Sequence, residues 1–159
     1  MKTLALVLAL TLTPAWAQRI EINLDRLAEK AKEKQEINID GDMIQKFAGQ
    51  MKLPVDSVKR LLVRHYEFEK PGAFTDADLA EVRKQASGSV WSKIVNVKEP
   101  NESVEIYALT QSGQMAGFLL IVAEARELTV VHLEGSIQLA QLQELVQSSI
   151  KFDTKSLEQ

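Results

Sequence analysis

The sequence predicts an α+β fold, with helices packed on an antiparallel β-sheet. Residues 90–134 contain four short runs rich in branched and aromatic side chains, separated by brief polar turns. This pattern is typical of a β-meander. Before residue 63 and after residue 136, apolar residues recur every three to four positions, as on one face of a helix. We expect a four-stranded meander, extended by one or two earlier strands, with about five helices on the sheet.

The N-terminus has the three parts of a secretory signal peptide. Lys2 supplies the positive charge, residues 4–13 form an apolar run, and Ala15-Trp16-Ala17 fits a small-residue cleavage site. The apolar run is shorter than the roughly 20 residues that span a bilayer. We therefore expect a signal peptide over residues 1–17, cleavage before Gln18, and an exported, periplasmic or secreted product. The alternative is a short anchor that stays attached.

The remainder, residues 18–159, is expected to form one domain, with an ordered core over about 22–148 and a tail over about 149–159. The absence of cysteine excludes a disulfide framework and a lipid-modified cysteine. The net charge is −3 at pH 7, and losing Lys2 would make it −4. A mildly acidic chain without a basic cluster is a poor candidate for nucleic-acid binding. No apolar run after the leader is long enough to span a membrane.

The first half of this domain is predicted to be mainly helical. Residues 24–31 carry an apolar stripe that Asn23 can cap, and the charged stretch 30–34 is expected to lie on the solvated face of that helix. A second amphipathic helix is expected over 43–51. Pro54 suits the first turn of a third helix over 54–62.

Two strands and one more helix complete this half. Ile37-Asn38-Ile39 alternates as a short strand does, and the branched and aromatic residues of 63–69 favour a second strand. Thr75 and Asp78 then form a capping-box pattern, which predicts a helix that ends near Gly88.

The meander strands are predicted at about 90–98, 103–110, 114–123 and 128–134, and a last amphipathic helix after Ser136. The strand around Phe118 is apolar on both of its faces, and so is the strand that follows it. Both faces of the sheet therefore need cover, either from the helices or from a partner.

Several segments, in this order along the chain, are similar to a known family. They are Tyr66-Glu67-Phe68, Val90-Trp91-Ser92, Val104-Glu105-Ile106-Tyr107, the strand at Gly117, and residues 127–135 followed by Ile137 and Leu142. Over about residues 24–145 the chain resembles domain-of-unknown-function family 4252. The resemblance implies a secreted or envelope bacterial protein. It implies no activity, so it supplies no catalytic residue.

Two patterns raise the question of a metal site. Asn38, Asp40 and Asp42 alternate like the first ligands of a calcium loop, but Met43 stands where that loop needs glycine and Gly49 where it needs glutamate. We therefore interpret these carboxylates as helix caps.

The only two histidines, His65 and His132, fall on predicted strands and could face each other if those strands pair. A structural zinc needs four good ligands, and cysteine is missing. We expect no metal site and no cofactor.

Catalytic motifs are also missing from the sequence. Ser89, Ser112 and Ser136 lie beside glycines, but none is in a Gly-x-Ser-x-Gly motif. Turn formation accounts for these serines. Asp76 and Asp78 could form a carboxylate pair, but their place in the first turn of a helix favours a capping role.

Aromatic residues on the strands leave one further possibility open. Trp91, Tyr107 and Phe118 could form a stacking platform, although strand aromatics more often belong to the core. We predict a non-enzymatic binding or regulatory module of the bacterial envelope, whose partner is an unknown protein, peptide or envelope component. The alternatives are a small periplasmic hydrolase with a site built from scattered Asp, Glu, Ser and His residues, and an envelope assembly subunit.

Overall fold

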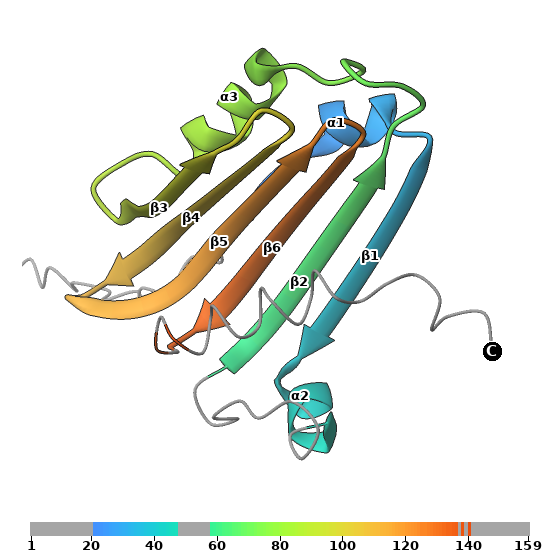
Figure 1. Ribbon diagram of the computed structural model, residues 1–159. Helices are drawn as coiled ribbons and strands as arrows, with labels where there is room; N and C mark the ends of the chain where they lie inside the picture. The colour runs from blue at the N-terminus through green and yellow to red at the C-terminus, as the bar shows by residue number, and fades with distance from the viewer. Residues whose placement is uncertain (1–20, 48–57, 137, 139, 141–159) are drawn as a thin grey trace, which may run out of the picture.

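The computed structural model describes residues 21–47, 58–136, 138 and 140. These residues form one antiparallel sheet of six strands in the order β1-β2-β6-β5-β4-β3, together with short helices (Figure 1). The strands are β1 (Glu33–Asp40), β2 (Val58–Glu67), β3 (Trp91–Lys98), β4 (Glu102–Gln111), β5 (Gln114–Glu124) and β6 (Glu127–Gly135). The helices in this part of the chain are α1 (Asp25–Lys30), α2 (Gly41–Phe47) and α3 (Asp76–Gln85).

Strands β3 to β6 form the predicted meander, each pairing with the next along the chain. The β4–β5 turn is tight because Ser112 and Gly113 both have positive φ angles, of 51° and 75°. Two consecutive positive φ values are what a two-residue hairpin turn of type I′ requires. Strand β2 adds to the free side of β6, and β1 adds to β2. Among the strands that the structure describes, β1 and β3 therefore form the edges of the sheet.

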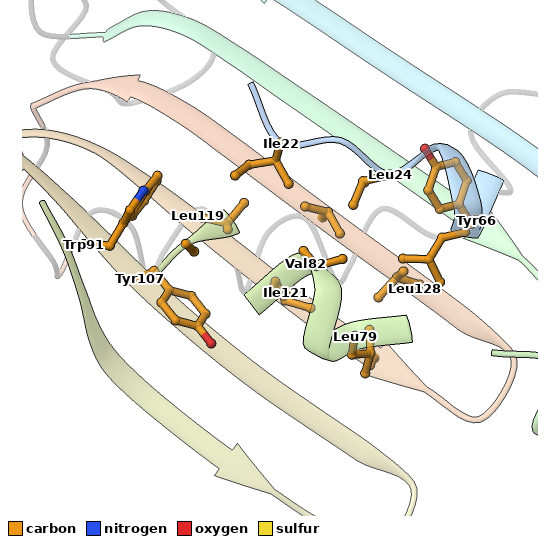
Figure 2. Close-up of a cluster of buried hydrophobic side chains, with 14 of the residues drawn as sticks. Ile22, Leu24, Tyr66, Leu79, Val82, Trp91, Tyr107, Leu119, Ile121 and Leu128 are labelled. Carbon is orange, nitrogen blue, oxygen red and sulfur yellow. The ribbon is translucent and has the colours of Figure 1, made fainter. Parts of the chain in front are cut away.

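The two faces of the sheet carry separate apolar cores. The first face is the one covered by α1 and α3, whereas α2 lies at the opposite end of the sheet, beyond β1 and β2 (Figure 1). The first core lies between this face and the two helices: Leu24 and Val82 point toward Ile121 and Leu128 (Figure 2). The second core lies on the other face and consists of Ile44, Val58, Leu61, Ile106, Ala108, Phe118, Leu120, Val122, Val131 and Leu133.

The central strands are buried on both faces, as their apolar pattern predicts. Leu119 belongs to the first core and is 0% exposed, and Leu120 belongs to the second core and is 3% exposed. Among the helices described, α2 contributes to the second core through Ile44.

The predicted fold class is wrong in its balance of strands and helices. The described residues contain six strands and three short helices, instead of four strands with one or two additions and about five helices. The largest error is the predicted third helix over 54–62, because β2 begins at Val58. Leu61 and Leu62 point to opposite faces of a strand that has a neighbour on each side. A short apolar run does not by itself distinguish a buried strand from a helix.

The second error concerns the charged stretch 30–34, which was expected on a helix. Helix α1 ends at Lys30, and β1 begins at Glu33 and continues for eight residues, well beyond the predicted Ile37-Asn38-Ile39. Charged residues are common on edge strands, because such a strand is largely exposed to solvent. The expected signal peptide, Pro54, and the last predicted helix beyond Ala140 lie outside the described residues, as does the end of the helix predicted over 43–51.

Candidate ligand-binding groove between α1 and α3

Helix α3 begins at a complete capping box, which confirms the prediction from the sequence. The Thr75 backbone N–H donates to Asp78 Oδ2 over 2.8 Å, and the Asp78 N–H donates to Thr75 Oγ1 over 3.4 Å. The first N–H groups of a helix have no carbonyl four residues before them to donate to, so the box supplies acceptors there and fixes where α3 starts.

Two polar contacts hold α1 beside α3. Lys30 Nζ lies 2.8 Å from both carboxylate oxygens of Asp78, whose side chain is only 5% exposed. The hydrogen bond from Lys30 lowers the pKa of Asp78 and outweighs the opposing effect of burial. Farther along α3, the Asn23 N–H donates to Gln85 Oε1 over 2.7 Å, and Gln85 Nε2 donates to the Asn23 carbonyl over 2.8 Å. The helix pair is thus fixed at two separated points.

Between these contacts lies a groove with a volume of about 390 Å³. Its apolar part comes from Leu24, Leu27 and Val82, all members of the first core. Its polar part comes from the contact residues Asn23, Asp78 and Gln85 and from three further charged residues, Arg26, Glu81 and Lys84. The groove therefore combines an apolar wall with charges of both signs.

The charged groups of Arg26, Glu81 and Lys84 have no partner within the described part of the chain. All three residues are exposed, and their side chains make no hydrogen bond or ion pair to another described residue. Two of the three are cations. An apolar wall beside two uncommitted cations fits a ligand that carries an apolar group and an anionic one.

A second charged cluster lies outside the groove and anchors the other side of α3. Glu105 on β4 is 3% exposed, and its carboxylate lies 2.8 Å from Arg83 Nε and 2.7 Å from Lys93 Nζ. Burial alone would raise the pKa of Glu105, but the hydrogen bonds from Lys93 and Arg83 reverse this and lower it. Arg83 also contacts Asp76 over 3.0 Å. The cluster joins α3 to β4 and β3, and its charges are paired.

The two histidines do not come together. Strands β2 and β6 do pair, but His65 lies opposite Thr129, while His132 lies opposite Leu62. Neighbouring positions on a strand point to opposite faces, so the histidines lie on opposite faces of the sheet. His65 Nδ1 is 2.9 Å from Thr129 Oγ1. His132 is buried, and its Nε2 atom has no hydrogen-bond partner among the described residues.

The calcium-like triplet does not form a ligand set either. Asn38 Oδ1 accepts from Arg60 Nε over 3.1 Å, and Asp40 Oδ1 accepts from the Met43 N–H over 3.1 Å, which makes Asp40 the cap of α2. Asp42 is exposed in the first turn of α2. Within the ranges described, no group of three or more His, Asp or Glu residues is placed to hold a metal ion.

The stacking platform is not formed, because its members face different sides of the sheet. Trp91 and Tyr107 belong to the first core, whereas Phe118 is fully buried in the second. The three serines are exposed, and Ser112 is part of the β4–β5 turn. The capping interpretation is confirmed for Asp78, while Asp76 pairs with Arg83.

The groove residues carry no sequence signature of a binding site. Arg26 and Lys84 were indistinguishable from other charges on solvated helix faces, because no short motif joins α1 to α3. The only indication was the capping pattern at Asp78, whose buried carboxylate also needs the cation that Lys30 provides.

Comparison with known proteins gives one match. The sequence model of the family described as "Domain of unknown function (DUF4252)" matches residues 12–145, which is most of the chain. No curated protein and no solved structure matches it. Among the helices that the structure describes, none is long and apolar enough to cross a membrane.

Proposed function

The chain belongs to the DUF4252 family, whose description assigns no activity, and we propose that it is an exported, non-enzymatic binding module of the bacterial envelope that uses the α1–α3 groove as its binding site. The observation that carries the binding proposal is the pairing of an apolar wall with two uncommitted cations, Arg26 and Lys84. Binding sites commonly combine a mainly apolar lining with a few polar groups that orient the ligand.

The chemistry of the groove favours an amphipathic anion, such as a fatty-acyl carboxylate. An acyl chain would lie against the small part of Leu24, Leu27 and Val82 that reaches the groove, since each is only 2% exposed. Its carboxylate would accept charge-assisted hydrogen bonds from Arg26 and Lys84. Glu81 would then disfavour a second negative charge on the ligand.

The hydrolase alternative has less support from the groove. A general acid that works near neutral pH needs a carboxyl group with a raised pKa. Lys30 instead lowers the pKa of Asp78, the buried carboxylate of the groove. Burial and the nearby Glu127 and Glu102 do raise the pKa of Glu124, but Glu124 is exposed at the end of β5 and does not line the groove.

Isothermal titration calorimetry with sodium decanoate tests the proposed site. We expect saturable binding that the Arg26→Gln/Lys84→Gln variant weakens about tenfold or more, since each charge-assisted hydrogen bond contributes roughly 1.5 kcal/mol or more. The matched control, Lys59→Gln/Lys70→Gln, removes two exposed cations outside the groove and should bind like the unaltered protein. Equal binding of decyltrimethylammonium, or no effect of the groove variant, would contradict the proposal.

The export part of the proposal is supported by the leader-like order of residues 1–17. Intact-mass spectrometry of the protein recovered from the periplasm or medium of a bacterial host should give a chain that begins at Gln18. Recovery of the chain only from the cytoplasm with Met1 retained would defeat this part and leave the binding proposal unaffected.

A further inference from the structure

Among the described strands, β1 forms one outer edge of the sheet. It pairs with β2 on one side, and its eight residues make no hydrogen bond to any other described strand. Seven of the eight residues are exposed, including Ile37, which at 51% is the most exposed large apolar side chain described. An edge of this length presents a row of backbone donors and acceptors to a further strand.

The other edge, β3, is protected. Its register with β4 shifts between Lys93 and Val95, and such a bulge interrupts the regular backbone that a new strand would need. Lys93 is also engaged with Glu105. The register of β1 on β2, by contrast, runs without a break from Glu33↔Glu67 to Asp40↔Arg60. The edge suited to pairing is therefore β1.

We propose that β1 pairs antiparallel with β1 of a second copy of this chain, with Ile37 of the two copies facing each other across a two-fold axis. Antiparallel neighbours place paired side chains on the same face of the sheet. In this register Lys34 lies opposite Asp40 of the second copy, and the two-fold axis generates the same pair again. The two sheets then join into one sheet of twelve strands.

The charged side chains of β1 favour this register over those shifted by one residue in either direction. Moving the axis to Glu36 places two Glu36 carboxylates opposite each other, and moving it to Asn38 places Glu36 opposite Asp40. Like charges directly opposite destabilise a strand pair, and opposite charges stabilise it. The Ile37 axis is the choice among these three that avoids like-charge pairs and forms two opposite-charge pairs.

The second face gains apolar contact in the same arrangement. Ile37 and Ile39 point to the face of the second core, against which Ile39 packs. Pairing brings both isoleucines of each copy together and continues that apolar surface across the axis. A single strand pair is a small interface, so the dimer is expected to be weak and to exchange with monomer.

Cysteine cross-linking tests the register directly, because the chain has no cysteine of its own. Paired residues of an antiparallel ladder have Cα atoms about 4.5–5.5 Å apart, within the range that a disulfide spans. Under mild oxidation the Ile37→Cys protein should form a covalent dimer. Val97→Cys, which is 47% exposed on the protected edge β3, is the matched control and should stay monomeric.

A second pair of variants tests the register between the two β1 strands. Gln35 lies opposite Ile39 of the second copy, so a mixture of Gln35→Cys and Ile39→Cys proteins should form mixed disulfides. Gln35→Cys alone should not cross-link, because its two copies would be about 14 Å apart along the strand.

Sedimentation velocity of the protein without cysteine substitutions provides an independent readout. The average mass should rise with concentration toward twice that of the monomer, and Ile37→Lys should remove this rise by placing two cations on the axis. Cross-linking of Val97→Cys as fast as Ile37→Cys would overturn the proposal. So would a concentration-dependent dimer that Ile37→Lys leaves intact.

Discussion

His132 shows how a single polar side chain makes the first core sensitive to acid. It is 2% exposed, its ring centroid lies 6.5 Å from that of Trp91, and its Nε2 atom has no hydrogen-bond partner in the part of the chain that the structure describes. Burial lowers the pKa of His132, while the nearby charges of Glu134, Arg60, Arg64 and Glu21 have smaller and partly opposing effects. The folded protein therefore keeps His132 neutral at a pH where the unfolded chain already takes up the proton.

We expect the free energy of unfolding to fall as the pH drops through about 6.5, the ordinary pKa of histidine. The unfolded state then binds more protons, so the loss from this one group is at most about 1.4 kcal/mol per pH unit. His132→Leu should remove this part of the slope, and His65→Gln, which leaves His132 in place, should retain it. Urea melts between pH 7 and pH 5 would measure both, and equal slopes in the unaltered protein and His132→Leu would contradict the prediction.

The carboxylates that form ion pairs in the folded protein change the free energy of unfolding in a lower pH range. The pKa values of Asp78 and Glu105 are lowered, so their stabilising contributions are present at neutral pH and are lost only as the pH falls below the ordinary range of carboxyl groups, near 4. The histidine effect between pH 7 and pH 5 is therefore separable from theirs.

At the scale of elements, the close contact of β5 with β6 depends on Gly117. A Cβ atom added there would lie 2.5 Å from the Leu133 carbonyl oxygen, which is backbone and cannot move aside easily. Gly117→Ala should therefore destabilise the protein by about 1–3 kcal/mol, as overpacking does. The matched control is Gly41→Ala, whose Cβ would meet its nearest backbone atom at an ordinary 3.6 Å. Urea melts that gave the two variants equal stability would show that the strands can separate at Gly117.

The elements also differ in how far the sequence predicts them. The meander strands and the capping box were predicted because turn residues and local hydrogen bonds mark their limits. Residues 58–62 were assigned to the wrong type of element because their apolar residues fit a helix as well as a buried strand, and only pairing with β6 decides between the two. The groove could not be predicted, since its charged residues come from helices about fifty positions apart and share no motif.

At the scale of the whole molecule, the sheet has a core on each face. Leu119→Ala and Leu120→Ala remove neighbouring side chains from the first and the second core, and both leucines are buried. Each variant should cost roughly 2–5 kcal/mol, as buried leucines do. The measurement is the free energy of unfolding in urea for both variants. A cost under about 0.5 kcal/mol for either one, typical of a surface position, would mean that its face is open to solvent.

We propose that this molecule binds its ligand in the groove on the helix-covered face. The most direct test is a ¹H–¹⁵N correlation spectrum of the assigned protein, recorded during titration with sodium decanoate. We expect the largest amide shifts on α1 and α3, around Leu24, Leu27 and Val82, and we expect the Arg26→Gln/Lys84→Gln variant to lose them. Shifts centred instead on the second core, around Ile106, Leu120 and Val131, would contradict the proposal.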